Sequence, residues 1–183
     1  MPSSSPHLAF VGMAGVGKSA IARRIAQRFG LPVVDIDAAV VESTGRSIPE
    51  IFAADGEARF RELETAALRS ALESTVPSVI ATGGGIVESP TNRELLARHA
   101  RTVLLHTTDE VLVERLRNSS NKRPLLEGDL EANLRALHER RDDLYRDVAD
   151  LAVEVGFLDL TGTTGVVEAA IAQRWPVAEG TGT

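Results

Sequence analysis

A glycine-rich segment near the start of the chain has the residue types needed to hold a phosphate chain. Residues 12–19 read Gly-Met-Ala-Gly-Val-Gly-Lys-Ser and fit the pattern G-x-x-x-x-G-K-S/T. Its glycines let backbone N–H groups converge on a phosphate, and a helix that begins here adds its positive end. Lys18 can reach the outer phosphates, and the Ser19 hydroxyl can bind Mg²⁺. An ordinary glycine-rich turn is the alternative, but this composition gives about 10⁻³ matches by chance, so we predict a nucleotide-phosphate site.

The contacts with the phosphates are expected from the loop and from the first residues of the helix after it. We expect Lys18 to lie on an exposed loop that faces the ligand. The predicted contact residues are Gly15, Val16, Gly17, Lys18, Ser19 and Ala20.

Two aspartates follow the next apolar run. Asp35 and Asp37 stand at the end of a predicted strand, and ligands of open α/β sheets bind beyond the carboxyl ends of the strands. The period of two along a strand predicts that both side chains point the same way. One of them can then hold Mg²⁺ through water, and the other can accept a hydrogen bond from a substrate hydroxyl. The alternative is that Asp37 only caps a helix that begins at Ala38.

Two later features allow both a functional and a structural interpretation. Arg61 and Glu64 are one helical turn apart, and taken alone they fit a solvated ion pair. The triplet 83–85 consists of three glycines at the end of another apolar run. Because glycine there is costly in conformational entropy, we expect something to approach this backbone closely. A flexible turn is the alternative.

These residues must be positioned by short apolar runs that alternate with longer amphipathic stretches. Runs this apolar suit strands that are covered on both faces, as in a parallel sheet. Strands are predicted at 7–11, 32–36, 78–82, 101–106 and 151–155. Helices are predicted at 18–29, 59–73, 92–98, 109–117, 130–148 and 165–174. The alternation predicts an α/β sandwich with right-handed crossovers.

Composition limits the class of protein. The formal net charge of −6 gives no support to non-specific binding of nucleic acid, which needs a broad basic surface. Charged or polar residues interrupt every apolar stretch before the ~18 residues that a membrane span needs. The chain has no cysteine, which excludes disulfides and thiolate metal sites. We expect a cytoplasmic protein with small-molecule partners.

The length of 183 residues predicts one domain, with its core at about 7–175. The ends at 1–6 and 177–183 are small, polar or glycine-rich, and we expect frayed tails there. Residues 118–129 form a polar stretch with Pro124 and Gly128, and loops of this length in compact domains are usually functional or disordered.

Several motifs together resemble one family. The phosphate loop, the acidic pair, Thr44–Ile48 with Phe60–Glu64, the glycine triplet, Arg123–Leu126 and Arg140–Tyr145 occur in the order seen in shikimate kinases. Any one motif after the phosphate loop is weak, whereas the ordered set is specific and covers nearly the whole chain. The resemblance implies a P-loop NTPase of the nucleoside-monophosphate-kinase type, with a central five-stranded parallel sheet flanked by helices. It also implies a monomer that transfers the γ-phosphoryl group of ATP to the 3-hydroxyl of shikimate, with one Mg²⁺ ion.

The resemblance assigns roles to residues beyond the phosphate loop. Asp37 matches the carboxylate that binds the hydroxyls of shikimate, and Arg61 and Arg141 match the pair that binds its carboxylate. The backbone of Gly83, Gly84 and Gly85 lines the same pocket. We choose Arg141 over Arg140 because it lies four residues before Tyr145. Glu64 is expected to orient Arg61.

The remaining roles concern the nucleotide. Arg123 matches an arginine on a lid, at 118–129, that meets the transferring phosphoryl group. Arg117 matches an arginine near adenine. Lys18, Asp37 and Arg123 are thus the predicted catalytic residues, and Ser19 and Asp35, the latter through water, are the predicted metal contacts. Ala20 departs from the hydroxyl residue that many members carry there, but Mg²⁺ needs only Ser19.

Three other functions compete with this prediction. A gluconate kinase would also pair hydroxyls with a carboxylate, although Arg61 and the glycine triplet favour shikimate. A nucleoside-monophosphate kinase fits less well, because nothing in the sequence indicates a second base pocket. A nucleotide-binding regulator without turnover is disfavoured, because every motif residue is present.

Overall fold

A five-stranded parallel sheet forms the centre of the computed structural model, which describes residues 7–119, 124–156 and 158–175. The strand order is β2-β3-β1-β4-β5. The strands are β1 (His7–Val11), β2 (Val33–Asp35), β3 (Val79–Ala81), β4 (Ala100–His106) and β5 (Leu151–Glu154). The predicted parallel sheet is confirmed, and β1 has the predicted bounds. The predicted tails at 1–6 and 177–183 lie outside the described residues.

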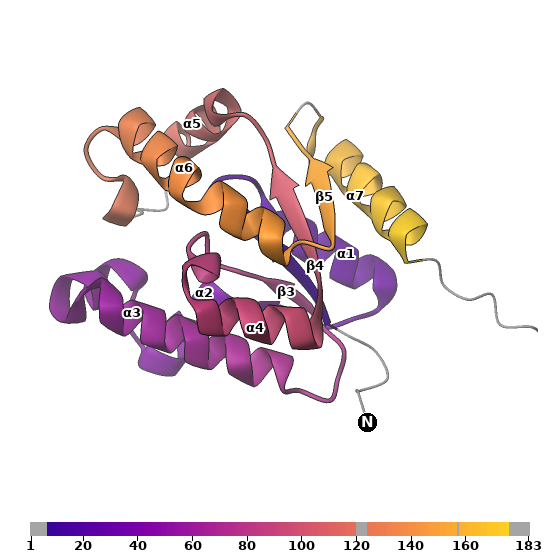
Figure 1. Ribbon diagram of the computed structural model, residues 1–183, viewed down its shortest axis with the longest axis horizontal. Helices are drawn as coiled ribbons and strands as arrows, with labels where there is room; N and C mark the ends of the chain where they lie inside the picture. Colours follow the sequence, from indigo (N-terminus) through magenta and orange to yellow (C-terminus); the bar gives the residue numbers. More distant parts are fainter. Residues whose placement is uncertain (1–6, 120–123, 157, 176–183) are drawn as a thin grey trace, which may run out of the picture.

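Helices cover both faces of this sheet (Figure 1). α1 (Lys18–Phe29) and α7 (Leu160–Arg174) pack against each other on one face. The other face carries α4 (Pro90–His99) and α6 (Leu130–Val148), and α3 (Ile48–Leu72) runs beside α4. The remaining helices are α2 (Ile36–Thr44), α5 (Asp109–Arg117) and the 3-10 helices η1 (Ile86–Glu88) and η2 (Pro124–Leu126).

The segment after β2 differs from the prediction. We expected a strand to continue through Ile36, but α2 begins there, so Asp37 lies in the first turn of a helix. The argument from strand alternation is therefore wrong for this pair. Asp35 is the N-cap of α2, and its Oδ1 accepts a hydrogen bond from the backbone N–H of Ala38 at 3.3 Å. The capping role that we considered for Asp37 belongs to Asp35, because the helix starts earlier than expected.

Three more helices begin earlier than predicted, and α4 does so by only two residues, at Pro90. α3 starts at Ile48, where Ser47 and Glu50 form a capping box, and it continues across a kink at Gly56 with φ 80°. The kink interrupts the apolar pattern, so only the part from Arg59 was recognisable. α7 starts at Leu160, capped by the Asp159 side chain.

The core that supports the site is centred on β1, all of whose residues are buried. Phe10, Ile80 and Leu104 on three neighbouring strands are at most 2% exposed. Burying a side chain of this size contributes about 1.5–3 kcal/mol, so the strand ends are a rigid platform for the loops that follow them.

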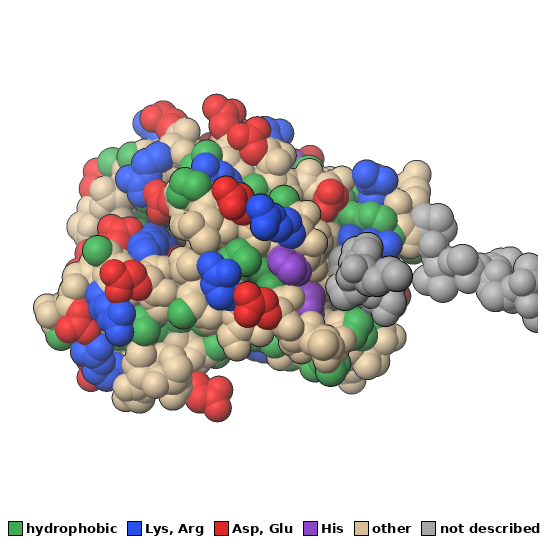
Figure 2. Space-filling model, turned by 60° about the horizontal axis from the view of Figure 1, so that its bottom comes forward, with side chains coloured by type: hydrophobic (Ala, Val, Ile, Leu, Met, Phe, Trp, Pro, Cys, Tyr) green, Lys and Arg blue, Asp and Glu red, His purple; other side chains and the backbone are tan. Residues whose placement is uncertain are grey.

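The surface carries charges of both signs. Figure 2 shows Lys and Arg side chains interspersed with Asp and Glu on the face it displays. Within the described ranges, none of the helices has the length and apolar character needed to cross a bilayer.

Candidate active site

The phosphate loop lies between β1 and α1. Gly12, Gly15 and Gly17 have positive φ angles of 137°, 84° and 106°, a region that favours glycine. A Cβ on Gly12 would also lie 2.2 Å from the backbone oxygen of Leu105 on β4. The glycine pattern is therefore required by the loop itself, which curls tightly over the neighbouring strand.

Lys18 is held inside this loop. Its ammonium donates hydrogen bonds to the carbonyl oxygens of Gly12 at 2.7 Å and Met13 at 2.9 Å. The residue is 7% exposed, and both of these carbonyls belong to the phosphate loop, which therefore encloses part of the lysine side chain.

A wide cavity of about 550 Å³ opens in front of the loop and of the N-terminus of α1. Its wall brings together Lys18, Ser19 and both aspartates of the acidic pair. The complete lining is Ala14, Gly15, Gly17, Lys18, Ser19, Ala20, Arg23, Asp35, Asp37, Ala38, Gly84, Arg115, Leu116 and Ser119.

A narrow cavity of about 100 Å³ lies beside it. One side is polar, with Asp37, Arg61, Glu64 and Arg141, and the other is apolar. Its lining is Ala14, Asp37, Ile48, Phe52, Phe60, Arg61, Glu64, Gly83, Gly84, Gly85, Pro124, Leu125, Leu126, Leu137 and Arg141. Arg140 is not among these residues and its side chain is 57% exposed, whereas that of Arg141 is 3% exposed.

The two cavities share part of their walls. Ala14, Asp37 and Gly84 line both of them. A group bound in the narrow cavity at Asp37 therefore lies next to the end of a phosphate chain bound in the wide cavity.

The glycine triplet allows charged side chains to pack directly on its backbone. A Cβ on Gly85 would lie 2.3 Å from Nη1 of Arg61, and one on Gly83 would lie 2.3 Å from Oε1 of Glu64 and 2.8 Å from Oδ1 of Asp37. Contacts this short are not tolerated, so larger residues would displace the polar side of the narrow cavity. The predicted close approach to this backbone is confirmed, and side chains of the protein itself make it.

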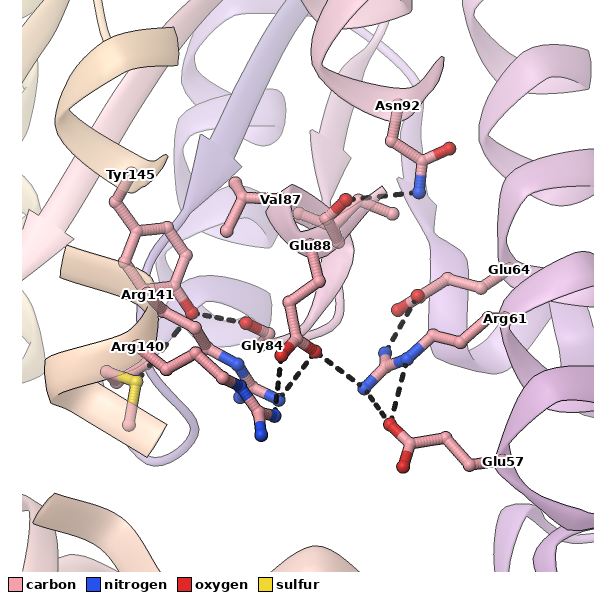
Figure 3. A network of polar contacts seen from close by, with 12 residues as sticks. Glu57, Arg61, Glu64, Gly84, Val87, Glu88, Asn92, Arg140, Arg141 and Tyr145 are labelled. Carbon is pink, nitrogen blue, oxygen red and sulfur yellow. Dashed lines mark hydrogen bonds and ion pairs between the residues drawn. The ribbon is translucent and has the colours of Figure 1, made fainter. Parts of the chain in front are cut away.

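Carboxylates surround the two arginines of the narrow cavity, as Figure 3 shows. Arg61 donates from Nη1 to Glu64 at 2.9 Å and from Nη2 to Glu57 at 2.9 Å. Glu88 accepts from Nη2 of Arg61 at 3.2 Å and from Nη2 of Arg141 at 2.9 Å. Glu64 therefore contacts Arg61 as expected, whereas Glu57 and Glu88 were missed. Glu57 lies one helical turn before Arg61, a spacing that could have indicated it, but no local pattern indicates Glu88.

The carboxylates of this network have opposite pKa shifts. Burial has the largest effect on Glu64 and raises its pKa, against the opposing charge of Arg61 and with a further increase from Asp37. Burial also acts to raise the pKa of Glu88, but Arg141, Arg61 and Arg140 outweigh it and hold that pKa below its usual value.

Two buried polar atoms of the narrow cavity have no hydrogen-bond partner within the described residues. They are Oε1 of Glu64 and Nε of Arg141. Leaving such a group unpaired costs about 1–3 kcal/mol, so buried polar groups are normally paired. Both atoms belong to side chains of the polar residues that line this cavity.

Arg117, which we expected near adenine, is placed differently. Arg117 is not part of the wide cavity's wall; it lines a neighbouring groove between α5 and α6 and pairs with Glu131 at 2.5 Å. Arg115 lines the wide cavity instead and donates to the backbone oxygen of Val16 at 3.2 Å. Arg123 lies outside the described residues.

Comparison with known proteins identifies the family. The family model for shikimate kinase matches residues 14–159. A shikimate kinase from Xanthomonas euvesicatoria pv. vesicatoria (strain 85-10) is 42% identical over 171 residues, which cover 93% of this chain and 94% of the relative. This chain belongs to the shikimate kinase family.

Further members of the family agree in sequence and in fold. A shikimate kinase from Halorhodospira halophila (strain DSM 244 / SL1) is 44% identical over 165 residues, covering 90% of this chain and 88% of the relative. The solved structure titled shikimate kinase from Acinetobacter baumannii in complex with shikimate has a TM-score of 0.88 and 32% identity, covering 96% and 97% of the two chains. The predicted P-loop NTPase fold of the shikimate kinase family is therefore confirmed.

Proposed function

We propose that this chain transfers the γ-phosphoryl group of ATP to the 3-hydroxyl of shikimate, giving shikimate 3-phosphate and ADP. The observation that carries the proposal is the wall shared by the two cavities. Ala14, Asp37 and Gly84 border both the wide cavity, which has the phosphate loop, and the narrow cavity, which has the arginines. Membership of the shikimate kinase family supports the same reaction.

The wide cavity is assigned to the phosphates of ATP. The backbone N–H groups of Gly15, Val16 and Gly17 and the start of α1 at Lys18–Ala20 favour an anion there. Lys18 would exchange its carbonyl partners for the outer phosphates. Arg115 is the arginine that borders this cavity, so we rank it with Arg117 as a candidate nucleotide contact.

The donor set at this end fits a magnesium ion that accompanies a nucleotide. The Ser19 hydroxyl and the Asp35 carboxylate line one cavity, and both are the oxygen donors that Mg²⁺ prefers. The described residues contain no group of three or more acidic, histidine or cysteine side chains able to hold a metal. Mg²⁺ bound to nucleotides usually takes only one or two protein ligands, so a small donor set suits it. When bound, the ion neutralises charge on the phosphate oxygens.

The narrow cavity is assigned to shikimate. Arg61 and Arg141 would bind its carboxylate, because guanidinium groups suit the bidentate geometry of carboxylates. The backbone of Gly83–Gly85 and the apolar side chains opposite would enclose the ring. Asp37 would hold the reacting hydroxyl beside the phosphate loop.

Catalysis in this arrangement depends on positioning and charge. Phosphoryl transfer passes through a loose transition state, so the enzyme mainly aligns the two oxygens and neutralises the phosphoryl charge. Asp37 would orient the attacking hydroxyl and accept its proton. We assign Arg123 to the transferring phosphoryl group from the family resemblance, and residues 118–129 to a lid that excludes water; the described Pro124–Leu126 already borders the narrow cavity.

We further propose that the chain acts as a monomer in the cytoplasm. Each side chain assigned to the described site comes from a single copy of the chain, so no partner subunit is needed to complete it. Gel filtration combined with light scattering would measure the mass of the particle.

One coupled ADP-release assay tests the reaction against its alternatives. The purified chain is supplied with ATP and Mg²⁺ and with shikimate, gluconate or AMP as acceptor. We expect turnover with shikimate only, and its loss when EDTA removes the metal. Turnover with gluconate or AMP, but not with shikimate, would show that the proposed acceptor is wrong. ATP binding without turnover on any acceptor would favour a regulator.

A further inference from the structure

Glu88 forms a bridge between two helices at the edge of the narrow cavity (Figure 3). Its Oε2 accepts hydrogen bonds from Nη2 of Arg141 on α6, at 2.9 Å, and from Nη2 of Arg61 on α3, at 3.2 Å. Its Oε1 lies 2.5 Å from Nη2 of Arg140. One carboxylate therefore connects the two arginines assigned to the acceptor, although they come from elements far apart in the sequence.

Glu88 approaches these arginines from outside the cavity. Arg61 and Arg141 belong to the wall of the narrow cavity, whereas Glu88 does not. Its outer oxygen pairs with Arg140, whose side chain is 57% exposed. Glu88 thus contacts the arginine pair and Arg140 without being part of the cavity wall.

The backbone that carries Glu88 is firmly held. Asn92, which is 1% exposed, donates from Nδ2 to the carbonyl oxygen of Ile86 at 3.1 Å. Arg93 donates to the carbonyl oxygens of Val87 at 2.7 Å and Glu88 at 3.3 Å. These side chains belong to α4, so η1 is fixed to that helix. The backbone of Glu88 is therefore anchored to α4 independently of the arginines that its side chain contacts.

The segment from Gly83 to Glu88 also contacts α6 at its other end, through the glycine triplet. The hydroxyl of Tyr145 donates to the carbonyl oxygen of Gly84. Tyr145 lies one turn after Arg141 on α6 and is 1% exposed. The helix that provides Arg141 is thus attached to this segment at two points, by Tyr145 and by Glu88.

The charges in this region explain why a bridge is needed. The guanidinium groups of Arg61 and Arg141 repel each other, and a ligand carboxylate needs both at once. Glu88 supplies a negative charge in contact with both, and the positive charges around it hold its pKa below the usual value. Without it, Arg61 would keep its contacts with Glu57 and Glu64, but the contact that joins it to Arg141 would be lost, and ligand binding would have to supply that order.

We propose that Glu88 is a positioning residue that joins Arg61 to Arg141 and preorganises them for the carboxylate of the acceptor. This inference rests on the proposed function, because it takes the two arginines as the acceptor site. Glu88 itself would not touch the acceptor or the reacting atoms.

The first test is the steady-state kinetics of Glu88→Ala. We expect the KM for shikimate to rise roughly tenfold, the size of one lost charge-assisted hydrogen bond, with kcat and the KM for ATP within about twofold of the parent. The matched control is Glu62→Ala on α3, which removes a carboxylate from an exposed pair with Arg59 and should leave all three constants unchanged. Should Glu88→Ala fail to fold, Glu88→Gln keeps the shape of the side chain and removes its charge.

A double-mutant cycle separates positioning from general damage. In an Arg141→Ala background the contact between Glu88 and residue 141 is already lost, so Glu88→Ala should raise the KM for shikimate less than about twofold further. The carboxamide of shikimate, tested as a competitive inhibitor, should bind the parent and Glu88→Ala equally, because it lacks the carboxylate that the bridge serves.

Each result decides the proposal. An unchanged or lowered KM for shikimate in Glu88→Ala would overturn it, and a lowered value would mean that Glu88 competes with the acceptor. Equal losses for shikimate, its carboxamide and ATP would also overturn it, because they would reflect structural damage. If the parent chain does not phosphorylate shikimate at all, the proposed function itself is wrong.

Discussion

The two ends of the crevice are built in different ways. At the phosphate end, the loop and helix start that are assigned to the phosphates form one continuous segment, Gly12–Ala20, shaped by glycine conformations and the start of α1. The acceptor end takes its polar side chains from three helices, α2, α3 and α6, with the backbone of the glycine triplet between them. A site made of backbone groups can be encoded locally, whereas a site made of side chains from distant elements depends on how those elements pack.

The ends also differ in the contacts of their cations. At the phosphate end, Lys18 donates to the backbone carbonyls of Gly12 and Met13, and the phosphates of a triphosphate can replace these acceptors. At the acceptor end, Arg61 and Arg141 are balanced by Glu57, Glu64 and Glu88. A ligand with a single carboxylate offers less energy for rearrangement than a triphosphate does. The arginines that bind this carboxylate therefore need to be in place before the ligand binds.

Removing the lysine at the phosphate end gives the largest expected effect. Lys18→Ala should lower turnover roughly 10²–10³-fold, as expected when one preorganised donor is lost from a site of developing charge. The KM for shikimate should change little. ADP release at saturating substrates measures this, with Arg28→Ala, on the far end of α1 and paired with Glu168, as control. Turnover close to that of the parent would contradict the role of Lys18.

Conservative changes at the acceptor end should affect binding more than turnover. Arg61→Lys and Arg141→Lys keep the positive charge but lose the planar guanidinium group, whose parallel N–H groups can bind both oxygens of a carboxylate. Each substitution should therefore raise the KM for shikimate roughly 10- to 100-fold. Arg59→Lys, in an exposed ion pair on the same helix, is the matched control. If both variants bind shikimate like the parent, this cavity does not hold its carboxylate.

A methyl group on the glycine triplet tests the packing between the two ends. Gly85 has an ordinary φ of −96°, but an added Cβ would lie 2.3 Å from Nη1 of Arg61. Gly85→Ala should therefore displace Arg61 and raise the KM for shikimate roughly tenfold. Gly165→Ala on α7, where a Cβ meets nothing within 4 Å, should leave the kinetics unchanged. Equal behaviour of the two variants would contradict the steric argument.

The smallest effect concerns the pH dependence of stability. Glu64 has a higher pKa in the folded protein than in the unfolded chain. The stabilisation from this shift is complete below about pH 4.5 and is lost as pH rises through the folded-state pKa. The difference in free energy of unfolding between the parent and Glu64→Gln should therefore shrink as pH rises. Glu88 has a lower pKa in the folded protein than in the unfolded chain. The stabilisation from this shift is complete above about pH 4.5 and is lost as pH falls through the folded-state pKa. The difference in free energy of unfolding between the parent and Glu88→Gln should therefore shrink as pH falls. Thermal unfolding between about pH 3 and 8 should show opposite trends of a few °C. Parallel trends would contradict this assignment.

Local patterns predicted most of the fold. α1, α5 and α6 have the predicted bounds, because their apolar spacing and end signals are contained in the helices themselves. α2 was missed because it follows β2 directly, without a turn residue between them. The first part of α3 was missed because the kink at Gly56 breaks the apolar period.

Some residues of the candidate site were predicted and others were not, because only contacts within a few residues leave a recognisable pattern in the sequence. The residues of the phosphate loop were recognisable from spacing alone, and the arginine pair was recognisable through the resemblance to shikimate kinases. Neither route indicated that Glu88 contacts Arg61, Arg140 and Arg141. Among the described elements, α4, β4, α5 and η2 lie between Glu88 and Arg141, so no periodic pattern connects the two residues.

The amino-acid sequence by itself determined the phosphate loop, the alternation of strands and helices, and the presence of arginines and glycines suited to a small acid. Each of these follows from conformational preferences and side-chain chemistry within a few residues. Only the tertiary structure decided that Asp37 borders both cavities from a helix, that Lys18 is enclosed by its own loop, and that Glu88 joins the arginine pair. Those contacts depend on the packing of distant elements against one sheet, which local preferences do not specify.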